Sequence, residues 1–125
     1  MTEKTNKKIL IAEDEKSYSR ALVLKLKNNG FEVDLAENGE DVLKMLKKKK
    51  YDLLLLDLIM PKMNGFSVLE SINKNKIKTK VIVISNLSQT EDEKKAKKLG
   101  AYGYIVKANI SIVDVISKVQ KTLKK

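Results

Sequence analysis

The sequence predicts an α/β domain built as a doubly wound, five-stranded parallel sheet with helices on both faces. Three observations lead to this fold class. Short apolar runs alternate with amphipathic stretches along the chain, as in successive β-α-β units. The four leucines at 53–56 are typical of a strand buried on both faces. Most apolar runs also stop at a polar residue, at the edge where open α/β sheets bind ligands.

The predicted strands are short and end at characteristic residues. The first stops at the acidic pair Glu13-Asp14 and the third at Asp57. The second alternates apolar and polar residues, which favours an edge strand. The fourth is rich in β-branched residues and ends at Ser85, and the fifth ends at Lys107. In chain order, the predicted strands are residues 8–12, 31–35, 53–56, 80–84 and 103–107.

Helix signals separate and follow these strands. Tyr18, Leu22 and Leu26 recur at a spacing of four, which is one face of a helix that Asn29-Gly30 ends. The helix expected at 91–99 is mostly polar. The apolar faces of the other three helices are Val42, Leu43 and Leu46; Phe66, Leu69 and Ile72; and Ile112, Val115, Ile116, Val119 and Leu123.

The composition limits the available chemistry. With 125 residues and 42% hydrophobic content, we expect residues 1–125 to form one domain with one core. The chain has no histidine and no cysteine, which excludes imidazole bases, thiolate nucleophiles, disulfides and the usual zinc sites. A metal would need oxygen ligands, and Mg²⁺ or Mn²⁺ suits them. No leader-like or membrane-spanning segment is apparent, so we expect a cytoplasmic protein without membrane contact.

The polar residues at the strand ends predict a reactive site. The first and third strands are neighbours where the strand order of a doubly wound sheet reverses, so Glu13, Asp14 and Asp57 should lie close together. Two like charges about 4 Å apart repel by roughly 4 kcal/mol at an effective dielectric near 20, so the cluster needs a cation or a shared proton. Mg²⁺ and Lys107 would supply it. Asp57 is then a nucleophile for a phosphoryl group whose oxygens Ser85 and Lys107 contact.

The same residues resemble the receiver domain of two-component response regulators, over essentially the whole chain. The resemblance is carried by Glu13-Asp14, the stretch from Asp57 through Pro61 to Asn64-Gly65, Ser85, residues 100–104 and Lys107. It implies a flavodoxin-like fold with strand order 2-1-3-4-5. Because a receiver domain would take up the 125 residues, we expect a single receiver domain with no room for an output domain.

The resemblance further implies a role for each site residue. Asp57 would accept a phosphoryl group from a sensor histidine kinase, a phosphotransfer protein or a small phosphodonor. Asp14 would bind Mg²⁺ directly, Glu13 mostly through water, and the carbonyl of Ile59 would complete the metal site. The implied switch pair consists of Ser85 and Tyr104.

The implied activity is that of a switch rather than an enzyme, because the chain would at most catalyse its own phosphorylation and dephosphorylation. Its signal would pass to a downstream protein that docks on the fourth helix, fifth strand and fifth helix. The sequence leaves open whether it forms a homodimer.

Three features bear on how far the resemblance extends. Ala108 follows Lys107 where the family usually has a proline after a cis bond. A cis bond before a non-proline residue costs roughly 2.5 to 4 kcal/mol, so we expect a trans bond and a shifted loop. The net charge is +10, although receivers tend to be acidic. The resemblance implies that Ile59 and Leu87, two residues past Asp57 and Ser85, flank the approach of water to the phosphoryl group, and neither side chain can orient a water.

Two other functions are possible on the same fold. The basic charge is compatible with a scaffold or a nonspecific nucleic-acid-binding protein on the same fold. Specific base recognition is disfavoured because Arg20 is the only arginine, and we interpret the lysines as solvated surface. A flavin-binding electron carrier is disfavoured because aromatic residues make up only 5% and tryptophan is absent.

Overall fold

The structure is a computed structural model that describes residues 7–86 and 90–123. One parallel sheet has the strand order β2-β1-β3-β4-β5, which confirms the predicted fold class and order. Its strands are β1 (Lys8–Ala12), β2 (Glu32–Ala36), β3 (Leu53–Leu56), β4 (Lys80–Ser85) and β5 (Gly103–Val106).

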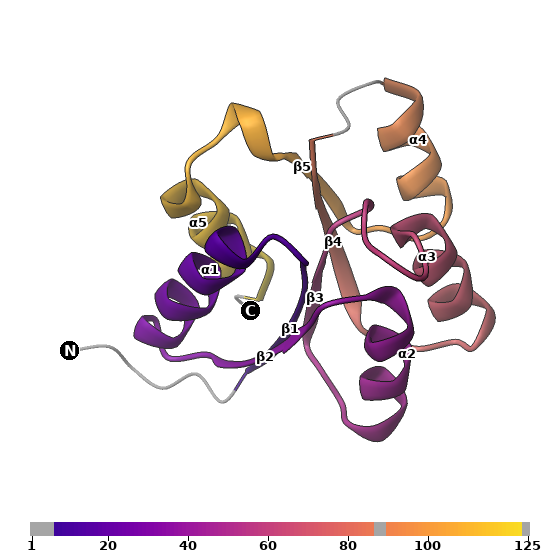
Figure 1. Cartoon of the computed structure of the whole chain (residues 1–125), viewed down its shortest axis with the longest axis horizontal. Coiled ribbons are helices and arrows are strands. Elements are labelled where there is room, and N and C mark those ends of the chain that lie inside the picture. Colours follow the sequence, from indigo (N-terminus) through magenta and orange to yellow (C-terminus); the bar gives the residue numbers. More distant parts are fainter. Residues whose placement is uncertain (1–6, 87–89, 124–125) are drawn as a thin grey trace.

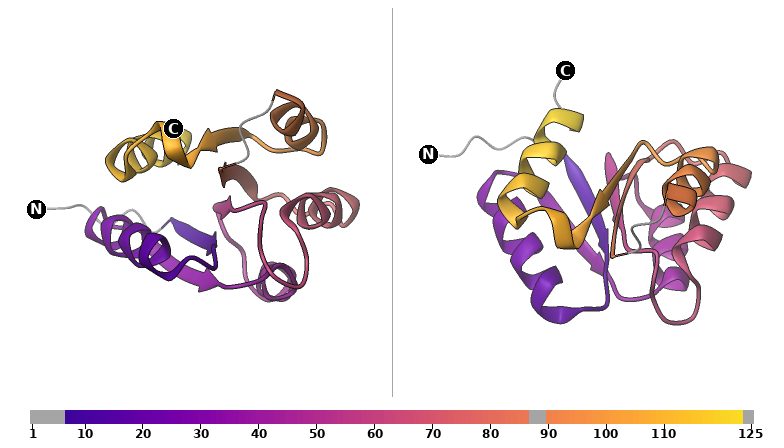
Figure 2. Two further views of the ribbon diagram at one scale, coloured as in Figure 1. Left: turned by 45° about the horizontal axis from the view of Figure 1, so that its top comes forward. Right: turned by 90° about the horizontal axis from the view of Figure 1, so that it is seen from above.

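Helices cover both faces of the sheet, as Figures 1 and 2 show, with α1 and α5 on one face and α2, α3 and α4 on the other. None of the helices in the described part of the chain is long and apolar enough to cross a membrane. The helices are α1 (Lys16–Asn28), α2 (Gly39–Lys48), α3 (Gly65–Lys74), α4 (Thr90–Lys98) and α5 (Ile112–Leu123).

The leucine run shows why both faces need a cover. Successive side chains of a strand point to opposite faces. Leu54 and Leu56 pack with the helices of the α2-α3-α4 face, while Leu53 and Leu55 pack with those of the α1-α5 face. All four are at most 1% exposed. An uninterrupted apolar strand is therefore the sequence of a central strand in a three-layer domain.

Helix α4 is attached more weakly than its neighbours. Ala96 is the buried residue of this otherwise polar helix. The ammonium of Lys95 lies 4.4 Å from the centre of the Phe66 ring on α3, which adds a cation-π contact. The apolar surface that α4 buries is small, so packing contributes little to holding it against the sheet.

Several elements differ from the sequence expectation by one residue, including β4, which extends to Ser85, and α4, which covers Thr90–Lys98 rather than 91–99. β2 covers Glu32–Ala36 rather than residues 31–35, at the edge of the sheet as predicted, and Leu35 is 39% exposed there. β5 ends at Val106, and Lys107 begins a short 3-10 helix, Lys107–Asn109. The described residues contain no cis peptide bond, so the Lys107-Ala108 bond is trans as predicted.

Asparagine caps and close-packed glycines shape the loops at the carboxyl edge of the sheet. The side chains of Asn38 and Asn64 accept hydrogen bonds from backbone N–H groups in the first turns of α2 and α3. The glycine after each cap has no room for a side chain. A Cβ on Gly39 would lie 2.5 Å from the Met63 carbonyl oxygen, and one on Gly65 would lie 2.6 Å from the Leu58 Cα. The loop after β3 therefore packs directly on the starts of α2 and α3.

A polar contact fixes the chain that leads into β3. The hydroxyl of Tyr51 donates to Asp34 Oδ2 at 2.6 Å, and Lys49 Nζ lies 3.1 Å from the same oxygen. The Tyr51 hydrogen bond is the main cause that lowers the pKa of Asp34, with burial opposing it and Lys49 adding to it. The ring of Tyr51 is buried, so this contact connects edge strand β2 to the entry of β3.

We predict that Tyr51→Phe lowers the free energy of unfolding by about 1 kcal/mol at pH 7. A lowered carboxyl pKa stabilises the fold above the unfolded value of about 3.9, and that contribution is lost as the pH falls through the folded value. The difference between wild type and variant should therefore shrink below about pH 4 in urea titrations. Tyr102→Phe, at an exposed tyrosine, should change stability by less than about 0.5 kcal/mol. A Tyr51→Phe effect independent of pH would contradict this account.

Candidate functional site

Asp57 lies at the carboxyl edge, one residue after β3. Its backbone N–H donates to the Ala12 carbonyl oxygen at 3.0 Å, which continues the β1-β3 pairing to this position. The residue is only 7% exposed. Its Oδ1 accepts a hydrogen bond of 3.1 Å from the backbone N–H of Ile59. The carboxylate is thus held in a fixed orientation at the centre of the edge.

Two more carboxylates reach Asp57 from the end of β1. Glu13, Asp14 and Asp57 each offer an oxygen, and these oxygens lie within 4.8 Å of one another. Glu13 is buried, with its backbone N–H donating to the Ala36 carbonyl at 3.1 Å and its Oε2 accepting from the Glu15 N–H at 3.0 Å. Asp14 is exposed. The structure therefore brings together the three carboxylates that the sequence placed there.

The ammonium of Lys107 lies inside this cluster. Its Nζ contacts Glu13 Oε1 and lies 3.4 Å from Asp57 Oδ2 and 3.6 Å from Glu15 Oε1. The Lys107 side chain is 9% exposed. The trans bond to Ala108 is compatible with this reach, because the flexible stem of lysine spans the distance from the end of β5.

Burial and the neighbouring charges have opposing effects on the pKa values of Glu13 and Lys107. Burial raises the pKa of Glu13 and the charge of Asp57 raises it further, while hydrogen bonds from Lys107 and Glu15 lower it. Burial lowers the pKa of Lys107, but its hydrogen bond to Glu13 and the charges of Asp57 and Glu13 outweigh burial and raise it. Lys107 thus stays protonated and serves as the resident cation of the cluster.

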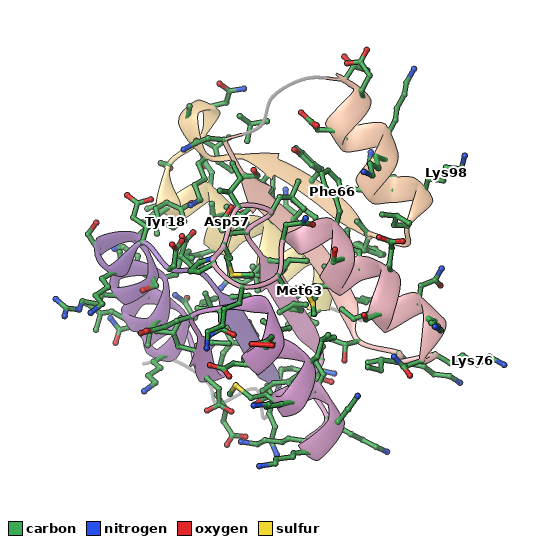
Figure 3. All side chains as sticks on the ribbon, turned by 45° about the vertical axis from the view of Figure 1, so that its right-hand side comes forward. Tyr18, Asp57, Met63, Phe66, Lys76 and Lys98 are labelled. Atoms are coloured by element: carbon green, nitrogen blue, oxygen red, sulfur yellow. The ribbon has the colours of Figure 1, made fainter. Side chains whose placement is uncertain are left out.

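Tyr18 and Glu15 belong to the site although the sequence did not indicate them. Lys107 Nζ lies 4.6 Å from the centre of the Tyr18 ring, and Figure 3 shows Tyr18 beside Asp57. The Tyr18 hydroxyl is buried without a hydrogen-bond partner in the described part of the chain, and burial raises its pKa. Tyr18 was assigned to the core face of α1. The available signal was its place in the first turn of the helix that follows the acidic pair.

Ser85 and Tyr104 lie on neighbouring strands beside the cluster. Ser85 is the last residue of β4 and is fully buried, while Tyr104 lies on β5 and is half-buried against the core of the α2-α3-α4 face. Burial raises the pKa of Tyr104, Asp92 on α4 raises it further, and a hydrogen bond with Ser85 lowers it. The two predicted switch residues are therefore in contact with each other.

Of the two apolar residues predicted to flank the site, Ile59 and Leu87, the structure describes only Ile59. Ile59 is 59% exposed and follows Asp57 by two residues, with its N–H bonded to the carboxylate. Leu87 lies outside the described residues. The metal role of the Ile59 carbonyl stays a prediction.

The donor set fits a hard divalent cation. All three clustered ligand atoms are carboxylate oxygens, which Mg²⁺ and Mn²⁺ prefer. One ammonium does not balance three carboxylates, so a divalent ion would neutralise the remaining charge. Glu13, Asp14 and Asp57 are the residues that would hold it.

Comparison with known proteins points to one family. The family described as "Response regulator receiver domain" matches residues 9–120. Transcriptional regulatory protein DltR of Streptococcus agalactiae is 40% identical over 100 residues, which cover 80% of this chain and 45% of that protein. Response regulator ArlR of Staphylococcus saprophyticus is 34% identical over 118 residues, covering 94% of this chain and 53% of that protein. The chain thus spans about half the length of these curated relatives.

Solved structures agree with this comparison. The receiver domain of Francisella response regulator 1452 is 32% identical with a TM-score of 0.88, covering 94% of this chain and 96% of that one. Response regulator TrrA of Thermotoga maritima, solved in complex with Mg²⁺-BeF, is 34% identical with a TM-score of 0.82. This match covers 94% of this chain and 99% of the TrrA chain.

We predict that the acidic cluster binds Mg²⁺ without phosphate and that Asp14→Ala weakens this binding by about tenfold or more, because it removes an oxygen ligand. Calorimetric titration with MgCl₂ would measure both affinities. Glu15→Ala is the matched control, since Glu15 is the exposed neighbour that contacts Lys107 and lies outside the ligand set. Its affinity should stay close to that of wild type. Equal affinities in wild type and Asp14→Ala would refute the assignment.

Proposed function

Because this chain belongs to the response regulator receiver family, we propose that it is a phosphoacceptor switch whose acceptor is Asp57. The phosphoryl donor would be a phosphohistidine on a sensor kinase or a phosphotransfer protein. A carboxylate oxygen of Asp57 attacks the phosphorus, the P–N bond breaks, and the donor imidazole takes up a proton. The supporting observation is the buried Asp57 carboxylate, which lies beside two further carboxylates and the ammonium of Lys107.

The neighbours of Asp57 support this chemistry through charge. Mg²⁺, held by Glu13, Asp14 and Asp57, would supply a positive charge to the phosphoryl oxygens. Lys107 already lies 3.4 Å from Asp57 Oδ2, so it is placed to contact an oxygen of the attached group. Tyr18 limits where that ammonium can move, because its ring lies against it.

The proposed output is a change in docking rather than turnover of a substrate. We propose that the Ser85 hydroxyl leaves Tyr104 and bonds to the phosphoryl group, which frees the Tyr104 side chain to move. Tyr104 lies on β5, between α4 and α5, so its movement would alter the surface offered to a downstream protein. The single receiver domain, its cytoplasmic location and any homodimer are part of the same proposal.

The central prediction is that Asp57 takes up one phosphoryl group in an Mg²⁺-dependent reaction. Incubation with acetyl phosphate and Mg²⁺ should add one phosphoryl mass in intact-protein spectra, and Asp57→Asn should abolish it. The matched control is Asp52→Asn, at the opposite end of β3, which should keep the adduct. Asp52 accepts a hydrogen bond from the Lys8 N–H, and an asparagine can still accept it. An unchanged adduct in Asp57→Asn would refute the assignment.

We also predict a long-lived phosphorylated state. Hydrolysis needs a water aligned with the phosphorus, and Ile59 and Leu87 offer no group to orient one. The double variant Ile59→Asn with Leu87→Glu should lose the phosphoryl group about tenfold faster or more, because it adds polar groups that orient water.

The decay would be timed by intact mass after removal of the donor. Ile59→Leu with Leu87→Ile keeps both side chains apolar and should decay like wild type. Similar or slower decay in the polar variant would show that the apolar side chains of Ile59 and Leu87 do not prolong the phosphorylated state.

A further inference from the structure

Charge is divided between the two edges of the sheet. Because all strands are parallel, every helix begins at the carboxyl edge and ends at the amino edge. The site carboxylates and the acidic first turns of α2, α4 and α5 lie at the carboxyl edge. The basic last turns of all five helices lie at the amino edge. In Figure 3, Lys76 and Lys98 point away on the side opposite Asp57 and Tyr18.

Helix electrostatics accounts for part of this division. Acidic residues near helix starts and basic residues near helix ends are favoured by the helix macrodipole. That effect does not account for lysines outside the helices. Lys50 precedes β3, Lys78 lies between α3 and β4, and Lys80 is the first residue of β4. In the described part of the chain, no carboxylate is within ion-pairing distance of these three.

These lysines line two hollows that lie side by side at the amino edge. One hollow of about 410 Å³ is lined by Lys7, Lys78 and Lys80, and the other, of about 380 Å³, by Lys49, Lys50 and Lys78. Both are also lined by Tyr51 and Asp52, so they form one continuous surface. Asp52 accepts a hydrogen bond from the Lys8 N–H at 2.8 Å, so its charge is partly engaged by the backbone. We call this surface, with Lys50, Lys78 and Lys80 at its centre, the basic edge.

We propose that the basic edge binds the phosphate backbone of double-stranded nucleic acid without sequence preference. Lysine ammonium groups are strongly hydrated point charges suited to phosphate contact, whereas base reading favours the planar arginine fork. The surface offers lysines and no arginine, since the one arginine is Arg20 on α1. Binding of this kind depends on the release of counterions and is steeply salt-dependent.

The surface favours a duplex over a membrane or a single strand. Membrane insertion needs exposed apolar side chains, and single strands need aromatic platforms for their bases. Tyr102, just before β5, is an exposed aromatic, but Lys80 Nζ lies 4.9 Å from its ring centre and covers one face. The basic edge therefore offers a ligand mainly the ammonium groups of its lysines. The lysines of the basic edge lie at the starts of β1, β3 and β4, three neighbouring strands that at about 4.8 Å spacing span roughly 10 Å, across which a duplex presents adjacent phosphates.

This binding surface is independent of the proposed phosphoacceptor. The six residues of β4 separate Lys80 from Ser85 by roughly 17 Å, about twice the Debye length at physiological salt. A phosphoryl group at the carboxyl edge would therefore be screened from a ligand at the basic edge. The proposal stands or fails separately from phosphorylation of Asp57.

The test measures fluorescence anisotropy of a labelled 20-base-pair DNA duplex with the full chain at several salt concentrations. The triple variant Lys50→Gln, Lys78→Gln, Lys80→Gln should bind about tenfold more weakly or worse at low salt. Its slope of log affinity against log salt should fall by about 2 to 3, because each phosphate contact contributes about 0.9.

A matched variant keeps the same net charge but changes lysines elsewhere: Lys16→Gln, Lys62→Gln, Lys94→Gln. All three positions are exposed and lie outside the basic edge. This variant should bind within about threefold of wild type with a nearly unchanged slope. Circular dichroism would confirm that both variants fold.

Four results would overturn the proposal. The first is an equal loss of duplex affinity in both triple variants, and the second is no duplex binding by wild type at low salt. The third is tighter binding to a single strand of equal length than to the duplex, and the fourth is tighter binding to vesicles of anionic lipid than to the duplex.

Discussion

The ammonium of Lys107 among the buried carboxylates is the interaction on which the carboxyl edge depends. A charged group removed from water is tolerated only when it is paired and hydrogen-bonded. Glu13 and Asp57 are both almost fully buried, and each has Lys107 and one backbone N–H within reach. Without the ammonium, burial and mutual repulsion would favour protonation of one carboxyl, and a protonated carboxyl is a poor nucleophile and a poor metal ligand. Lys107, the residue that follows the last strand, therefore favours the charged form of Glu13, which follows the first strand.

The parallel sheet explains how much of this site could be predicted from the sequence. Strand ends are visible as apolar runs that stop at polar residues, and parallel pairing brings those ends to one edge. Local patterns therefore placed Asp57, Glu13, Asp14 and Lys107 at strand ends, where the structure brings their side chains together. The strand order itself came from resemblance to a family, because periodicity does not reveal which strands are neighbours.

The features that were missed depend on contacts between distant elements. Tyr18 matched the apolar spacing of α1, and nothing in that spacing reveals that its ring meets an ammonium from the end of β5. The basic edge escaped notice for the same reason. Lys50 precedes β3, whereas Lys78 and Lys80 come from the segment that leads into β4, so only the pairing of β3 with β4 brings them together.

The slight attachment of α4 has a consequence for how the domain fluctuates. Segments that bury little apolar surface detach by sub-global opening at a free energy well below that of complete unfolding. With Ala96 as its buried residue and a half-exposed ion pair between Lys97 and Glu93, α4 is the helix whose release costs the least packing. Burial raises the pKa of Tyr104 on β5 and the charge of Asp92 on α4 raises it further, so this helix acts electrostatically on the strand it covers. Excursions of this one helix would expose the β5 edge while the other helices, with larger buried faces, hold the rest of the sheet intact.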